Sequence, residues 1–267
     1  MSRPRRRVAV LLGLLVLLAG AGWLALHRAS SIVPACTATT ATTAFTIDPE
    51  QAENATTIAA EAQRLGLPDH AVSVGLAAAL QESKLRNLHY GDRDSLGLFQ
   101  QRPSQGWGSP AELLDPRYAA AAFFRSLRRV HGWQDLPIYL AAQRVQRSAD
   151  ASAYAAWDTE SRTLARGLTG QTPAGFACRF PSVPRARAGT STAVAAAVSQ
   201  ALGPDALSPG VTRARGWVVA SWLLSRAPRY SIARVSFAGW SWTPAAGWRQ
   251  DPHARPAGVS YALRPAG

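Results

Sequence analysis

Glu82 is well placed for acid catalysis, because it ends a segment that is apolar on nearly every side. Between residues 69 and 83 the sequence has helical length and is dominated by small and aliphatic side chains: Ala71, Val72, Val74, Leu76, Ala77, Ala78, Ala79 and Leu80. A helix that is apolar all round belongs in the middle of a core. Its last turn then brings a carboxyl group to the edge of that core, where partial burial favours the protonated form that a general acid needs. A surface glutamate paired with Lys84 and Arg86 is the alternative interpretation.

Two further carboxylates lie in the segment Gly91-Asp92-Arg93-Asp94-Ser95. A glycosidase that inverts the sugar configuration needs a second carboxylate to activate water. Asp92 and Asp94 are the available candidates for that general base, and Asp92 is the one assigned to it. Because the same residue types are also typical of turns, a purely structural role for this segment stays open.

Glu82-Ser83 is followed by Gly97-Leu98-Phe99-Gln100. This order resembles the lysozyme-like superfamily, especially soluble lytic transglycosylases and goose-type lysozymes. In those families a Glu-Ser pair ends a buried helix, and a Gly-Leu-Met-Gln run follows within about twenty residues. Phe99 replaces the usual methionine, and Gly91-Asp92-Arg93 is similar to the goose-type sequence. The resemblance covers residues 58–164.

The resemblance implies a lysozyme-like domain that cleaves the MurNAc-GlcNAc β-1,4 bond of peptidoglycan glycan strands, with Glu82 as the catalytic acid and no cofactor. Residues that match the family's substrate-binding positions are Ser83, Gly97, Leu98 and Gln100. The third family motif, a Tyr-Asn-Ala-Gly type of turn, is not found in that form. The candidates for its polar contacts are Gln143, Gln146 and Tyr154.

Asp92 separates two reaction types. A lytic transglycosylase needs a single glutamate, whereas an inverting hydrolase needs a second carboxylate, and the sequence leaves both open. A catalytically inactive scaffold that binds peptidoglycan from the membrane is a third interpretation. The intact Glu82-Ser83 pair favours catalysis, and the missing third motif favours the scaffold.

The N-terminus has the pattern of a membrane anchor. A basic flank over residues 1–7 precedes an uninterrupted apolar run over residues 8–26, which is close to the length that crosses a bilayer. The basic flank is expected to stay in the cytoplasm. We therefore predict a single-pass membrane protein with its C-terminal bulk outside the cytoplasm. A cleaved signal peptide is the alternative.

Cys36 and Cys178 are the only cysteines, and they bracket the middle of the chain. In an oxidising compartment this placement predicts a disulfide, with two unpaired thiols as the alternative. The cysteines lack the spacing of zinc ligands, and the five histidines lie far apart, so no metal site is predicted.

The formal net charge of +13 comes almost wholly from arginine, since Lys84 is the only lysine. A basic surface favours polyanions. Nucleic acid is excluded because no groove-reading motif is present. Anionic wall polymers or lipid head groups fit an extracytoplasmic protein better, and compositional drift toward arginine is the alternative.

The remaining sequence divides into segments of different composition. Residues 27–46 are rich in Thr, Ala and Ser and predict a spacer. Helix starts at Asp48-Pro49, Ser109-Pro110 and Asp115-Pro116 predict a mainly α domain over residues 47–178. Its later helices are expected at 136–148 and 151–168. A linker over 179–190 leads to a small α+β module of unassigned role over 191–267, with helices at 192–202 and 215–226 and strands at 232–237 and 259–263.

Overall fold

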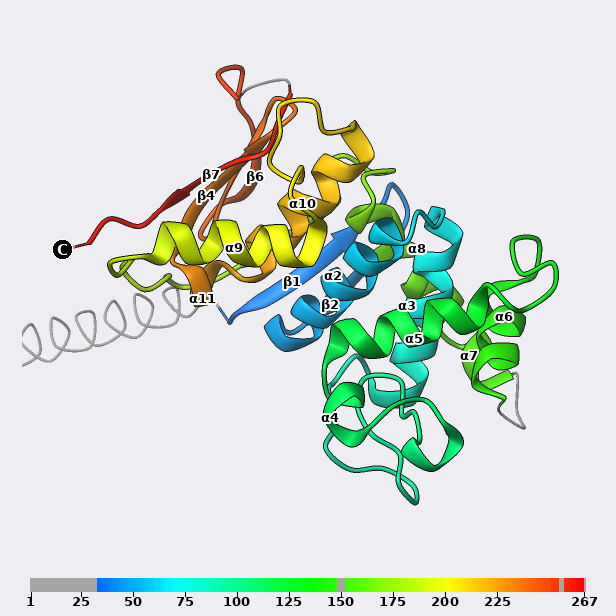
Figure 1. Ribbon diagram of the computed structural model, residues 1–267. Coiled ribbons are helices and arrows are strands. Elements are labelled where there is room, and N and C mark those ends of the chain that lie inside the picture. Colours follow the sequence, from blue (N-terminus) through cyan, green and yellow to red (C-terminus); the bar gives the residue numbers. More distant parts are fainter. Residues whose placement is uncertain (1–32, 148–151, 255–256, 267) are drawn as a thin grey trace, which may run out of the picture. The chain divides into compact units, whose positions relative to one another are not determined.

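The computed structural model describes residues 33–147, 152–254 and 257–266 (Figure 1). The predicted cytoplasmic flank 1–7 and membrane anchor 8–26 lie outside the described residues. Within those residues, no helix combines the length and the apolar character needed to cross a bilayer. Residues Pro34–Gly267 form one compact unit.

The described residues form ten α-helices, one short 3-10 helix and two antiparallel sheets. The helices are α2 (Pro49–Arg64), α3 (Asp69–Ser83), η1 (Pro103–Gln105), α4 (Pro110–Leu113), α5 (Pro116–Leu127), α6 (Ile138–Gln146), α7 (Ser152–Ala155), α8 (Asp158–Leu168), α9 (Thr190–Leu202), α10 (Arg213–Ser225) and α11 (Ala227–Tyr230). One sheet has the order β2 (Ala44–Ile47), β1 (Ala35–Thr39) and β3 (Phe176–Arg179). The other has the order β6 (Gly247–Gln250), β5 (Trp240–Thr243), β4 (Ile232–Phe237) and β7 (Ser260–Leu263).

The predicted helix starts are confirmed. Asp48 caps α2 in a reciprocal capping box with Gln51, and a proline occupies the first turn. Ser109 and Glu112 form the same box at α4, and the Asp115 side chain caps α5. These local signals need no tertiary contact, which is why the sequence places them well.

Helix α3 lies at the centre of the helical part and packs against α8, α6, α2 and α5 (Figure 1). Its residues from Ala71 to Leu80 are all buried, as the apolar pattern predicts. The helix ends at Ser83, because Lys84 adopts a left-handed backbone conformation with φ 55°. The predicted bounds of this helix are confirmed.

The helix predicted over 151–168 is instead two helices, α7 and α8, separated at Ala156 and Trp157. The Trp157 indole donates a hydrogen bond of 2.8 Å to Oε1 of Gln81 on α3. A contact with a distant helix therefore outweighs the local helical pattern at this point.

The prediction of a spacer over residues 27–46 is wrong from Ala35 onward, where β1 and β2 begin. Cys36 and Ala38 are buried while Thr37 and Thr39 are more exposed, so the segment alternates with the period of a strand. Its second partner, β3, is far away in the sequence. The predicted disulfide is confirmed: Cys36 and Cys178 are directly opposite each other on β1 and β3 and are covalently joined.

Tryptophan side chains of the four-stranded sheet contact the three-stranded sheet. The indole nitrogens of Trp242 and Trp248 donate hydrogen bonds of 2.8 Å to the β3 carbonyls of Cys178 and Phe176. Trp217 on α10 packs edge-on against Trp248. These side chains therefore contribute to the core between the two sheets.

Helix α10 packs against both α2 and β4, so the segments predicted as a domain over 47–178 and a module over 191–267 share one compact unit. The boundaries at the linker 179–190 stay a prediction. A buried charge lies where α10 meets α2: Arg226, which follows α10, is 6% exposed. Burial lowers the pKa of its guanidinium to about 10, and Glu53 opposes that shift.

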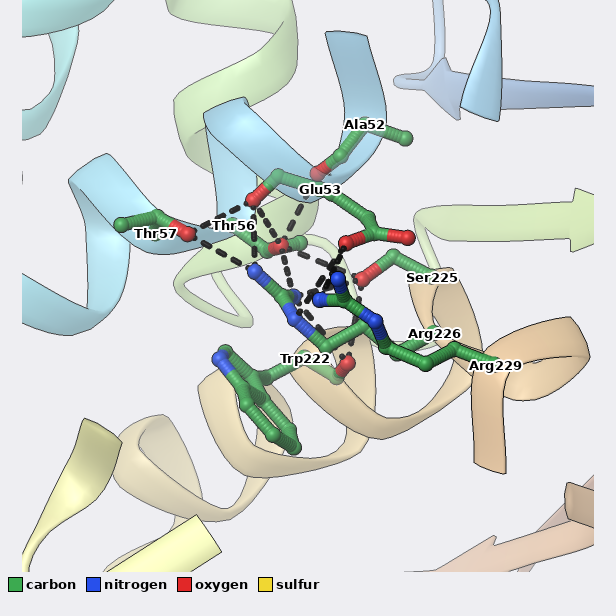
Figure 2. Close-up of polar contacts among 8 residues, drawn as sticks. All are labelled: Ala52, Glu53, Thr56, Thr57, Trp222, Ser225, Arg226 and Arg229. Carbon is green, nitrogen blue, oxygen red and sulfur yellow. Dashed lines mark hydrogen bonds and ion pairs between the residues drawn. The ribbon is translucent and has the colours of Figure 1, made fainter. Parts of the chain in front are cut away.

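Figure 2 shows how Arg226 reaches α2. Its guanidinium donates to the hydroxyls of Thr56 at 2.8 Å and Thr57 at 2.7 Å, to the Glu53 carbonyl at 2.9 Å and to the Ser225 hydroxyl at 3.0 Å. A buried charge is tolerated only when it is paired and hydrogen-bonded, and this one is.

Arg226→Ala is expected to lower the free energy of unfolding by about 3 kcal/mol, because several buried acceptors lose their donor at once. Arg229→Ala is the matched control. Its guanidinium is 63% exposed and reaches the same Glu53 at 3.4 Å, so its loss should cost below about 1 kcal/mol. Chemical denaturation measures both. Equal effects of the two substitutions would contradict this account of the junction.

Candidate active site

Glu82 opens onto a pocket of about 500 Å³, here called the Glu82 pocket. The carboxylate reaches it from the last turn of α3 and is half-buried. The other lining residues are mostly polar and come from the loop after Leu96, from the end of α6 and from α7: Gln100, Gln101, Arg102, Gln105, Trp107, Gln146, Arg147 and Tyr154. Four predicted site residues, Glu82, Gln100, Gln146 and Tyr154, thus line one pocket.

The Tyr154 hydroxyl donates a hydrogen bond of 2.5 Å to Oε1 of Glu82. Tyr154 is 1% exposed, so its ring is fixed by the core and its hydroxyl has a defined position. Tyr154 was expected to contact substrate. Its observed contact orients the Glu82 carboxylate through Oε1, and a contact between Tyr154 and substrate stays a prediction.

The surface ion pair considered for Glu82 is not formed. The Lys84 ammonium lies over the Trp157 ring, 4.4 Å from its centroid. Arg86 forms ion pairs with Asp48 and Glu50 at the start of α2. Both basic neighbours are therefore engaged elsewhere.

Ser83 ties the end of α3 to the loop that forms the pocket wall. Its hydroxyl, buried with the residue 5% exposed, donates to the Leu98 carbonyl at 2.7 Å and to the Ala79 carbonyl at 3.1 Å. It does not line the Glu82 pocket. Leu98 is fully buried, so both residues support the pocket from behind.

Gly97 is required by a close approach within the protein. Its φ is +73°, and a Cβ at this position would lie 2.1 Å from the Leu113 carbonyl oxygen. Its N–H donates to the Leu88 carbonyl at 2.7 Å. The glycine therefore packs the loop against α4, whereas a close approach to a glycan stays a prediction.

Two of the glutamines that line the pocket, Gln100 and Gln146, donate hydrogen bonds to backbone carbonyls. Gln100 donates through Nε2 to the Gly97 carbonyl at 3.1 Å, and Gln146 donates to the Phe99 carbonyl at 2.7 Å. Oε1 of Gln146 is buried without a hydrogen-bond partner in the part of the chain that the structure describes. Gln143 is half-buried on α6 and does not line this pocket.

Asp92 does not line the Glu82 pocket either. Its side chain is 90% exposed and its nearest charge is Arg93, at 4.0 Å. Asp94 accepts hydrogen bonds from Arg102 at 2.7 Å and from the Ser104 N–H at 2.8 Å, which hold the pKa of the Asp94 carboxyl well below its usual range. Asp94 thus stays ionised and fixes Arg102 at the pocket wall.

No protein-family model matches this chain, and no curated protein matches it significantly. The geometry of the pocket therefore carries the functional argument.

Gln101 is a site residue that the sequence reasoning missed. It is 2% exposed, and neither Nε2 nor Oε1 of its side chain has a hydrogen-bond partner among the described residues. Its backbone is paired in both directions with Leu96, which fixes the start of the side chain. A buried amide with donor and acceptor both unpaired is costly, and it lines the Glu82 pocket. Only the doubled Gln100-Gln101 marks it in the sequence.

Ser83→Ala is expected to lower the free energy of unfolding by about 1 to 3 kcal/mol, because the buried Leu98 carbonyl loses its donor. Ser73→Ala is the matched control on the same helix, since among the described residues the Ser73 hydroxyl reaches only the Asp69 carbonyl of its own helix, at 3.4 Å. Denaturant unfolding of both variants measures the difference. If the two serines proved equally important, Ser83 would not be the link between α3 and the loop.

Proposed function

We propose that this protein cleaves the glycan strand of peptidoglycan at the MurNAc-GlcNAc β-1,4 bond, with Glu82 as general acid in a lysozyme-like domain, and that it acts as a lytic transglycosylase. The observation that carries the proposal is that Glu82 is the only carboxylate among the described residues lining its pocket. An inverting hydrolase needs a second carboxylate beside the bond. Asp92, the candidate for that role, has a 90% exposed side chain outside the pocket lining.

One carboxylate is sufficient for a transglycosylase. The Glu82 carboxyl group gives its proton to the glycosidic oxygen, and the bond from that oxygen to C1 of the muramic sugar breaks. The resulting carboxylate accepts the proton of the muramic 6-hydroxyl as this oxygen attacks C1 and closes a 1,6-anhydro ring. The attack is intramolecular, so it is favoured by proximity. Glu82 ends protonated, and no water is consumed.

The contact with Tyr154 fits this role. Because Oε1 of Glu82 accepts the Tyr154 hydrogen bond, Oε2 is the oxygen that carries the transferred proton. The same contact keeps the carboxylate oriented between its two proton transfers. A fixed catalytic group is what general acid-base catalysis requires.

The pocket also offers groups suited to an N-acetylated sugar. The side-chain amides of Gln100 and Gln105 line the pocket, and an amide supplies both the acceptor and the donor that the N–H and the carbonyl of an acetamido group need. Half-buried Trp107 lines the same pocket and presents an aromatic face to a sugar ring. The Cys36–Cys178 disulfide suits the extracytoplasmic side of a membrane, where peptidoglycan lies.

The proposal predicts that Glu82→Gln loses at least about a hundredfold in the rate of release of soluble fragments from purified peptidoglycan, because general acid catalysis contributes on that order. The matched control is Glu160→Gln, the same change on α8 outside the pocket lining, and it should keep the wild-type rate. Dye-labelled peptidoglycan measures both.

Equal rates for wild type and Glu82→Gln would refute the role of Glu82. If neither protein released fragments while both bound peptidoglycan, the membrane-anchored, catalytically inactive scaffold would replace the enzyme. Asp92→Asn adds a second test, because an inverting hydrolase would lose its activity with this change and the proposed transglycosylase keeps it.

A further inference from the structure

The Glu82 pocket continues into a second hollow of about 270 Å³. The two share Gln105, Trp107, Gln146 and Arg147 in their linings. The two hollows are therefore adjacent, and the half-buried Trp107 side chain belongs to the wall of both.

This second hollow is strongly basic. Arg125, Arg129 and Arg147 line it, and no carboxylate does so among the described residues. It is called the arginine pocket below. Within the described part of the chain, none of these three arginines forms an ion pair with an acidic side chain, in contrast to Arg102 beside Asp94. The positive charge of the arginine pocket is therefore not neutralised by those residues.

The wall of the arginine pocket holds one of these cations in place. The Arg125 guanidinium lies over the Tyr118 ring, 5.6 Å from its centroid. The Tyr118 hydroxyl donates to the Trp107 carbonyl at 3.3 Å. Gly108 packs so closely on this ring that a Cβ there would lie 2.7 Å from it. The aromatic ring is thus fixed between the loop and α5, and it supports the cation above it.

Arginine at the end of a helix is ordinary, because the helix dipole favours a cation there. Arg128 is such a residue, and its guanidinium donates to the Leu65 carbonyl at 3.0 Å, away from the pocket. Arg125 and Arg129 differ from it because they line a hollow that joins the site of the proposed reaction.

We infer that the arginine pocket binds a carboxylate of the peptide stem carried by the glycan strand, so that the protein selects strands with peptides over bare ones. The inference rests on the proposed function, because the glycan in the Glu82 pocket brings the stem within reach. Guanidinium groups bind carboxylates and phosphates through paired hydrogen bonds. The stem is the favoured source because it is attached to the muramic sugar itself. A phosphate-linked polymer on the 6-hydroxyl would block the attack on C1.

The test measures binding without cleavage, using the full-length protein with Glu82→Gln. The ligands are glycan strands with intact stem peptides, the same strands stripped of peptides by an amidase, and intact strands with their carboxylates converted to amides. Intact strands should bind roughly tenfold more tightly than either of the others, the effect of one lost charge-assisted contact.

Adding Arg125→Gln and Arg129→Gln should remove that preference and leave the affinity for stripped strands unchanged. Arg128→Gln, on the same turn but outside the pocket, is the matched control and should keep the preference. The inference is overturned if the double variant keeps the tenfold preference, or if amidated strands bind as tightly as intact ones.

A fourth ligand tests whether the arginine pocket binds a phosphate in place of a stem carboxylate. It consists of glycan strands that carry a phosphodiester-linked polymer but no peptides. Tight, arginine-dependent binding of these strands alone would overturn the carboxylate assignment. Cleavage by the wild-type protein tests the proposed function separately. If that function is wrong, the wild-type protein cleaves neither intact nor stripped strands, and the binding comparison still decides the role of the arginine pocket.

Discussion

The burial of α3 is the constraint on which the rest of the structure depends. Because this helix is apolar on all sides, it has to be covered all round, and α2, α5, α6 and α8 pack against it. Only its two ends are less buried: Asp69 and His70 begin the helix, and Gln81 and Glu82 lie in the last turn. At that last turn Lys84 ends the helix and Ser83 donates a hydrogen bond to the Leu98 carbonyl. Glu82 therefore stands at the boundary between the core and a polar pocket.

The pocket is assembled around that carboxylate by segments that are separate in the sequence. The helix α7 contributes Tyr154, which donates a hydrogen bond to Glu82, and the loop after Leu96 contributes Gln101, whose buried amide has no hydrogen-bond partner among the described residues. The end of α5 contributes Arg125 and Arg129 to the adjoining hollow. One acid, and arginines that form no ion pair with an acidic side chain in the described part of the chain, together suit a sugar substrate that bears an anionic branch. That chemistry is the basis of the proposed action on peptidoglycan.

Features that depend on local chemistry could be predicted from the sequence. The capping boxes at Asp48 and Ser109, the apolar helix that ends at Ser83 and the disulfide all follow from neighbouring residue types or from the two cysteines alone. Features that depend on distant partners could not. The strand β1 pairs with β3 far along the chain, and the break between α7 and α8 accompanies a hydrogen bond from Trp157 to Gln81. The position of Gln101 in the pocket lining likewise emerges only from the structure, where its buried amide has no hydrogen-bond partner among the described residues.

The proposed lytic transglycosylase cleaves the glycan with the single carboxyl group of Glu82 and without a catalytic water molecule. Mass spectrometry of the fragments that the wild-type protein releases from purified peptidoglycan tests it most directly. We expect fragments that end in 1,6-anhydro-muramic acid. Each is about 18 Da lighter than its hydrolysed counterpart, because no water molecule is added when the bond is cleaved. Fragments that end in an ordinary reducing muramic acid would contradict it, because they require a water molecule and a group in this protein that activates it.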